Sequence, residues 1–463
     1  MDGEEIESTQ STNDLTQGVI WKKLALFAFP IFLGQLFQQM YNTCDSLIVG
    51  RFLGDDALAA VGSSGSLIFM MIGFFNGVAM GAGVIIAKYY GGKEYDKMKL
   101  AIHTDVAFGI AAGVLLTGLG VGFTPGILRL MNTPENVFPQ SVMYFRVYFC
   151  GALFSVLYNI FVGILHAVGD SKHPLYYLII SSLINVVLDL VLVGGLGLGV
   201  GAAAFATTLS QAISALLCCI RLVRQDTVYR LELKKIKFHW PSFCTIVRFG
   251  LPSGVQNSVI ALANLVVQSN INTFDSFAMA GCGAYSKVEG FAFLPIMCFS
   301  QGLATFVGQN LGAGKEDRVK KGVRFGILCS VILAEVVGVA IWLSAPWLIG
   351  IFTESPEVIA FGVRQCRTEA LFYCLLALSH CLAGIMRGAG RPAVPMFAML
   401  GFWCVLRVTY ITTVLHFYHR IEVVFSAYPL TWFCSCVVLL IYFFKADWMH
   451  AFERMEQAKK RGN

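Results

Sequence analysis

The sequence predicts an all-α integral membrane protein with 12 transmembrane helices in two pseudo-symmetric six-helix lobes. The first observation is compositional: the 463 residues are 56% hydrophobic and 13% charged, whereas soluble domains carry roughly 25% charged residues. The second is a series of apolar runs, each long enough to cross a bilayer, which takes about 20 residues. The third is an internal duplication of the chain.

The apolar runs fall into two groups of six on either side of a basic segment. The first six are residues 24–49, 58–87, 106–123, 142–165, 176–193 and 200–220. The second six are residues 243–271, 277–307, 325–347, 358–386, 394–414 and 423–444. The predicted domains are an N-terminal tail (1–22), an N-lobe (23–222), a linker (223–242), a C-lobe (243–445) and a C-terminal tail (446–463).

The basic residues set the expected orientation. With the N-terminus inside, only Arg51, Arg129 and Arg420 lie in outside loops, and most of the 34 Lys and Arg lie in inside tails and loops. The positive-inside rule therefore predicts a multi-pass protein of the cell membrane with both tails and the linker cytoplasmic. Topology also explains the net charge of +6, so we expect no nucleic-acid partner.

The duplication is visible in paired motifs. GGKEYDK at Gly91 is echoed by GAGKEDR at Gly312, and ILHAVGDSKHP at Ile164 by IMRGAGRPAVP at Ile385. Because each copy holds an even number of spans, both run in the same direction, related by an axis along the membrane normal. Transporters of this kind commonly bind substrate between the two halves.

Several motifs in a fixed order resemble one family. LRLMNTPENV, HAVGDSKHP, NVVLD, GAAAFATT and VGQNLGAGKEDR are similar to the multidrug and toxic compound extrusion (MATE) family, of the bacterial NorM/DinF-like type within the MOP flippase superfamily. The resemblance implies two lobes in a V that export organic cations and other amphipathic compounds in exchange for protons or sodium. It also implies an N-lobe ion site at Asp45, Asn185, Asp189 and Thr207.

A polar stripe supports that site independently. On the first span Gln35, Gln38, Gln39, Asn42, Asp45 and Ser46 recur every three or four residues. On the fifth, Ser182, Asn185 and Asp189 do the same. Lipid offers such side chains no partners, so the stripes face the bundle interior or a watery cavity. A purely structural role for the acids is the alternative, but the second repeat has Val266 or Val267 and Tyr410 at the matching points.

The residues permit two coupling chemistries. Two carboxylates in one poorly solvated pocket resist joint ionisation, so the pair can take up a proton. Alternatively, their oxygens with the Asn185 amide and the Thr207 hydroxyl form a hard oxygen site that suits Na+. No other cofactor is expected.

The second half offers weaker candidates. Its seventh span carries amides and no acid, whereas some sodium-coupled members of the family use a glutamate there, which puts a C-lobe ion site in doubt. Lys287, Glu289, Glu335 and Arg407 are isolated charges for which a buried ion pair and a cavity role are both open. The predicted substrate-cavity residues are Gln38, Asn42, Gln256, Asn257, Glu289 and Arg407.

Two other apparent motifs are better explained as turns between helices than as catalytic or nucleotide-binding sites. The His166 to Asp170 stretch with His173 is interpreted as a cytoplasmic turn, with Asp170 or Ser171 capping the next helix. GGLGLGVG at Gly194 lacks the Lys-Ser or Lys-Thr of a phosphate loop, and no other nucleotide motif appears. The energy for transport must then come from an ion gradient or from a partner protein.

The sequence thus predicts a monomeric, ion-coupled multidrug antiporter that alternates access between its lobes and is not an enzyme. Its partners are small amphipathic or cationic substrates and the bilayer. One alternative is a flippase for a lipid-linked anionic substrate, supported by Lys287 and Arg407. The other is an integral-membrane enzyme, for which no set of catalytic residues at one depth is found.

Overall fold

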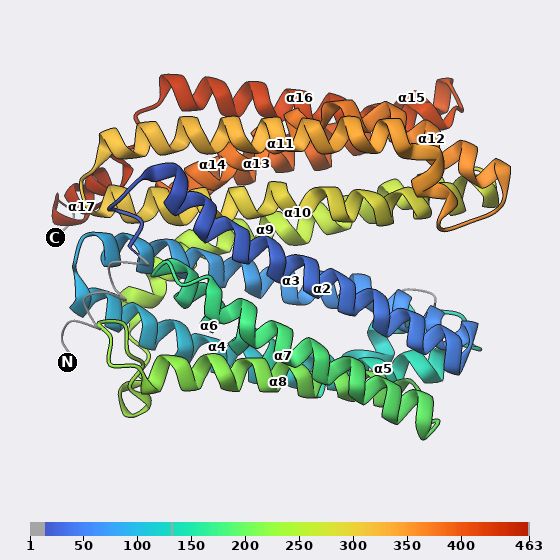
Figure 1. Ribbon diagram of the computed structural model, residues 1–463, viewed down its shortest axis with the longest axis horizontal. Helices are drawn as coiled ribbons and strands as arrows, with labels where there is room; N and C mark the ends of the chain where they lie inside the picture. Colours follow the sequence, from blue (N-terminus) through green and yellow to red (C-terminus); the bar gives the residue numbers. More distant parts are fainter. Residues whose placement is uncertain (1–13, 131–132, 462–463) are drawn as a thin grey trace. The chain divides into compact units, whose positions relative to one another are not determined.

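A computed structural model describes residues 14–130 and 133–461 of the chain (Figure 1). The first 13 residues of the predicted N-terminal tail lie outside the described residues, as do many side chains of helix α3. Every regular element in the described ranges is a helix. The predicted all-α class is confirmed.

The first half of the chain forms α2 (Ile20–Leu53), α3 (Asp55–Gly91), α4 (Tyr95–Leu130), α5 (Phe138–Cys150), α6 (Ala152–Ala167), α7 (Lys172–Asp189), η1 (Leu190–Gly195) and α8 (Val200–Arg224). After the short η2 (Leu233–Lys235), the second half begins with α9 (Trp240–Ile271), α10 (Ser276–Gly312), α11 (Glu316–Gly350) and α12 (Pro356–Glu369). It ends with η3 (Ala370–Phe372), α13 (Tyr373–Gly388), α14 (Ala393–Met399), η4 (Leu400–Leu406), α15 (Arg407–Phe417), α16 (Ile421–Lys445) and α17 (Ala451–Arg461).

Each predicted span lies on one helix or on a helix with a break. In the described residues, 10 helices are long and apolar enough to cross a membrane, and the pair α5–α6, bent by 48°, would be an eleventh span. The bend falls at Gly151, where a Cβ atom would lie 1.9 Å from Cγ2 of Thr208. The fourth span is therefore bent at a glycine, a position where a side chain would clash with the side chain of Thr208 on α8. The second predicted span lies in α3.

The chain divides into two compact units that do not coincide with its two halves. The first unit contains Phe29–Gly254, and the second contains Leu15–Ala28 and Val255–Asn463. The chain thus passes between units inside α2, next to Pro30, and inside α9, next to Pro252. A proline inside a helix removes one backbone hydrogen bond and favours bending there. Each crossing point therefore lies within two residues of a residue that favours a helix bend.

Glycines allow the first unit to include the start of α9. A Cβ atom on Gly81 of α3 would lie 2.2 Å from the backbone nitrogen of Gly250, and one on Gly77 would lie 2.3 Å from that of Gly254. Two helices approach this closely only where neither carries a side chain.

The second unit holds the beginning of the described chain by hydrogen bonds. Leu15 is 2% exposed, and its amide donates to Oε1 of Gln309 at 3.1 Å. Lys315 donates to the Thr16 carbonyl at 2.9 Å. Arg318 donates to the Leu15, Gln17 and Gly18 carbonyls at 3.2, 2.9 and 2.7 Å. These side chains belong to the VGQNLGAGKEDR motif, which therefore anchors the segment leading into α2.

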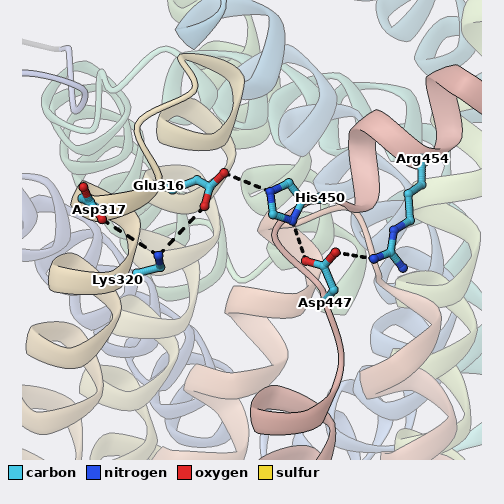
Figure 2. Close-up of polar contacts among 6 residues, drawn as sticks. All are labelled: Glu316, Asp317, Lys320, Asp447, His450 and Arg454. Carbon is cyan, nitrogen blue, oxygen red and sulfur yellow. Dashed lines mark hydrogen bonds and ion pairs between the residues drawn. The ribbon is translucent and has the colours of Figure 1, made fainter.

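The end of the chain docks on the same unit through charged contacts (Figure 2). His450 lies between two carboxylates, with Nδ1 2.6 Å from Asp447 Oδ1 and Nε2 3.0 Å from Glu316 Oε1. Arg454 of α17 also contacts Asp447. Hydrogen bonding to Asp447 raises the pKa of His450. The imidazolium donates to both acids at once, which ties the start of α17 to the start of α11.

Candidate functional site

The first unit brings the two predicted acids together. Asp45 of α2 is 7% exposed and Asp189, the last residue of α7, is fully buried. The two side chains lie within electrostatic range of each other. Immediately after Asp189 the backbone changes to the π-helix η1, a rare geometry that is often found at functional sites.

These acids have an unmet need for a donor or cation. Among the described residues, neither oxygen of Asp189 nor Oδ1 of Asp45 has a hydrogen-bond partner, although all three atoms are buried. An ionised carboxylate can only accept hydrogen bonds, so two ionised carboxylates cannot bond to each other. Their like charges also repel. One proton between them, or one small cation bound to both, removes that repulsion.

Asn185 and Thr207 differ in whether their side chains already have hydrogen-bond partners. Asn185 is fully buried one turn before Asp189 on the same face of α7, and its amide oxygen and nitrogen have no partner in the described chain. Thr207 is also buried but donates within α8, to the carbonyl of Ala203 at 3.1 Å. Asn185 therefore has free ligand atoms beside the pair. The Thr207 hydroxyl proton is already engaged, and its oxygen lone pairs are what remain for a cation.

The structure adds two tyrosines that the sequence analysis missed. Tyr41 lies one turn before Asp45, and its hydroxyl accepts from Gln211 Nε2 at 3.3 Å and also contacts the Gln38 side chain. Tyr144 of α5 is buried within electrostatic range of both acids. The position of Tyr41 on the polar stripe was a readable signal. The position of Tyr144 could not be read from the sequence, because it depends on which helices α5 packs against.

The predicted substrate residues differ in exposure. In the first unit, Gln38 is half-buried and Asn42 is exposed. In the second unit, Gln256 is buried, with Nε2 2.7 Å from Sδ of Met399, and Asn257 is half-buried. No described contact assigns a substrate role to any of them.

Arg407 lies in an aromatic pocket of the second unit. It is 2% exposed, its Nη2 donates to Thr431 Oγ1 at 2.9 Å, and its guanidinium carbon lies 4.4 Å from the ring centre of Tyr428. Glu289, half-buried on α10, is within electrostatic range of it. The described residues form no direct ion pair with Arg407, so the cation is held mainly by cation–π contact and the threonine.

A second acid in this cluster was missed from the sequence. Glu369 ends α12 and is fully buried, and its Oε1 accepts from Gln365 Nε2 at 2.9 Å. It lies within electrostatic range of Glu289 and Arg407. The rule that identified Asp45, a charge inside an apolar span, applies equally to Glu369. The second unit thus places two acids, one fully buried and one half-buried, within electrostatic range of one buried base.

The remaining charged candidates have structural roles or surface positions. Oδ1 of Asp170 accepts from the His173 amide at 3.3 Å, so Asp170 caps α7, whereas the Ser171 side chain makes no capping hydrogen bond. Although burial opposes it, hydrogen bonding to His173 and the nearby Arg221 hold the pKa of Asp170 below its usual value. Lys287 is exposed, and Glu335 accepts from the Cys374 amide at 3.3 Å.

Buried acids on membrane-spanning helices, in a chain built from two repeats, are typical of transporters that bind ions. The MatE family profile matches residues 30–191 and 252–411, once in each repeat. The chain is 30% identical over 436 residues to the probable multidrug resistance protein YoeA of Bacillus subtilis (strain 168), covering 91% of this chain and 93% of that protein. It belongs to the MatE family, whose members are transporters and not enzymes.

Other relatives agree with this assignment. The probable multidrug resistance protein NorM of Thermotoga maritima is 27% identical over 398 residues, covering 83% of each chain. A solved multidrug resistance MATE family transporter of the MOP superfamily, in an outward-facing conformation, superposes with a TM-score of 0.87 at 22% identity. It covers 93% of this chain and 96% of its own. The predicted family, fold class and absence of enzyme activity are confirmed.

Proposed function

We propose that the protein is a secondary active multidrug efflux transporter that exchanges amphipathic or cationic compounds for H+ or Na+. The names of its relatives, probable multidrug resistance proteins, support the efflux of drugs. The observation that supports ion coupling is the buried Asp45–Asp189 pair, in which both oxygens of Asp189 and Oδ1 of Asp45 have no hydrogen-bond partner in the described chain.

The proposed mechanism uses the pair as a switch. A bound proton or Na+ neutralises the two carboxylates, with Asn185 supplying a further ligand and Thr207 its hydroxyl oxygen. Loss of the ion leaves two like charges close together at the junction of α7 and η1. Their repulsion favours a different packing of α2 against α7. An ion shifts this equilibrium only by its difference in affinity for the two arrangements, and substrate bound to the other arrangement drives the ion off.

The second unit favours cationic over anionic substrates. Glu289 and Glu369 outnumber Arg407 in its buried cluster, so the cluster does not form a basic cavity. This speaks against a flippase for a lipid-linked anion, which needs several converging basic groups. Gln38, Asn42, Gln256, Asn257, Glu289 and Arg407 remain our candidates for substrate contact.

We further propose a monomer in the bacterial cell membrane with both termini in the cytoplasm. The charge asymmetry of the loops supports this orientation. A membrane-impermeant thiol reagent should label a cysteine at Gly195 from outside and one at Lys235 only from inside. The test requires a background without the exposed Cys150 and Cys244. Labelling in the opposite pattern contradicts the orientation.

Drug efflux in a pump-deficient host tests the function. The wild type should lower the accumulation of a fluorescent cationic dye, and Asp45→Asn and Asp189→Asn should not. Asp105→Asn is the matched control, because Asp105 is a buried acid of the same unit with no charged group in electrostatic range among the described residues. Equal dye accumulation with and without the wild-type protein contradicts the proposal.

A further inference from the structure

The turn between α13 and α14 carries two arginines, Arg387 and Arg391, that form no ion pair with an acid among the described residues. Arg387 lies in the last turn of α13, and a 2.8 Å hydrogen bond from the Arg391 amide to the Met386 carbonyl closes the turn. Arg387 is only 8% exposed, and its Nη2 donates to Ser300 Oγ of α10 at 3.0 Å. The Nε atoms of Arg387 and Arg391 are both buried without a hydrogen-bond partner in the described part of the chain.

A buried guanidinium with an unpartnered nitrogen lacks the opposite charge and hydrogen bonds that proteins normally provide for a buried cation. Removing a cation from water is unfavourable unless an opposite charge and hydrogen bonds replace the water. Arg407, the other deeply buried arginine of this unit, has aromatic rings and two acids within range. The titratable side chain in range of Arg387 is His380, whose buried Nε2 is also without a partner among the described residues. The described residues therefore supply no negative charge to Arg387.

The first repeat shows the same turn with its charge balanced. His166 and Asp170 lie 221 residues before Arg387 and Arg391. Asp170 is 2% exposed and pairs with His173 Nδ1 at 2.7 Å and with Arg221 Nη2 at 3.7 Å. The acid of the first turn is thus replaced by Arg391 in the second, so the second turn must obtain its negative charge elsewhere.

The location and geometry of the turn indicate the kind of anion. It joins two stretches that are long and apolar enough to cross a membrane, Pro356–Gly388 and Ala393–Phe417, so we expect it near the depth of the lipid phosphates. Guanidinium groups bind phosphate oxygens with paired hydrogen bonds. Basic sites between transmembrane helices on the cytoplasmic side are typical binding places for anionic headgroups, and the charge asymmetry of the loops predicts that this turn is cytoplasmic.

We propose that Arg387 and Arg391 bind a phosphate group at the α13–α14 turn, supplied by an anionic lipid headgroup or by a soluble phosphate. The site is separate from the Asp45–Asp189 pair and does not depend on the proposed transport function.

Thermal unfolding of the full-length protein in neutral detergent tests this. Three titrations are compared on delipidated protein: phosphatidylglycerol, phosphatidylcholine, and sodium phosphate against sodium chloride of equal ionic strength. The unfolding midpoint of the wild type should rise with phosphatidylglycerol and much less with phosphatidylcholine, whose ammonium group repels the arginines. A rise with phosphatidylglycerol alone identifies a lipid headgroup, and a rise with sodium phosphate as well shows that the phosphate group suffices. Both results support the site.

Two variants and a control decide the assignment. Arg387→Gln and Arg391→Asp should each weaken phosphatidylglycerol binding about tenfold, the loss expected for one charged hydrogen bond. Arg391→Asp restores the acid of the first turn, so it should fold well and lose the dependence on added anion. Arg324→Gln removes an exposed arginine of α11 and should bind as the wild type does. If no anion stabilises the wild type, or if both variants respond as fully as Arg324→Gln, the site does not exist.

Discussion

Arg318 donates a 2.7 Å hydrogen bond to the carbonyl of Gly18, some 300 residues earlier in the chain. The contact fixes the segment before α2 to the second unit, while the rest of α2 from Phe29 onward belongs to the first. The boundary between the two units therefore falls inside α2, next to Pro30. Arg318 is a positioning residue in this arrangement.

Arg318→Gln should release the segment. Loss of three charged hydrogen bonds, each contributing about 1.5–3 kcal/mol before relaxation, should speed amide exchange at Leu15 and Thr16 at least tenfold. Hydrogen–deuterium exchange of the peptide containing residues 14–19 measures this. Lys321→Gln, an exposed change one turn further along α11, serves as control. Unchanged exchange in Arg318→Gln contradicts the anchoring role.

The docking of α17 should depend on pH. The raised pKa of His450 means that its contribution is complete below about 6.5, the unfolded value, and is lost as the pH rises through the folded value. Hydrogen bonding to His450 lowers the pKa of Asp447, so the contribution of that carboxylate is present above about 3.9 and is lost in acid. Docking should be strongest between these limits.

Hydrogen exchange over α17 at pH 6 and pH 8 tests this dependence. Exchange, corrected for its intrinsic pH dependence, should be faster at pH 8 in the wild type. His450→Gln should exchange at the faster rate at both pH values, because glutamine cannot donate to Asp447 and Glu316 as an imidazolium does. A wild type whose corrected exchange is the same at both pH values is inconsistent with this account.

The contact between α3 and α9 should not tolerate a methyl group. Gly81→Ala should lower the stability of the first unit by about 1–3 kcal/mol, the usual cost of overpacking, because its Cβ would meet the Gly250 backbone. Gly118→Ala has nothing within 4 Å of the added atom and should be neutral or stabilising by up to about 1 kcal/mol. Thermal unfolding of the two variants gives the comparison, and equal stability argues against the close packing.

Neutralising Asp170 should destabilise the turn before α7. Asp170→Asn removes the charge that faces His173 and Arg221, which should cost about 2 kcal/mol at neutral pH. Because the folded pKa of Asp170 is lowered, the difference from the wild type should shrink as the pH falls toward 4. Denaturant unfolding at pH 7 and pH 4 measures both effects. A difference that grows in acid reverses the predicted sign.

The pattern of the sequence was sufficient for the spans and for the acid pair. Apolar runs set the length of each helix, and the polar stripe placed Asp45 and Asp189 on inward faces. The division into units was not readable, because nothing local in residues 15–28 shows that Gln309 and Arg318 hold them. Tyr144 was missed for the same reason, since its role depends on which helix α5 packs against. Glu369 was missed despite a readable signal.

Transport by purified protein in proteoliposomes tests the central claim most directly. A cationic dye is followed while a proton gradient and, separately, a sodium gradient is imposed on vesicles holding the wild type, Asp45→Asn, Asp189→Asn or the control Asp105→Asn. Our account predicts that one gradient drives dye movement in the wild type and in Asp105→Asn, and that neither drives it in Asp45→Asn or Asp189→Asn. Wild-type rates in both Asp45→Asn and Asp189→Asn under the driving gradient would show that the buried pair does not couple transport.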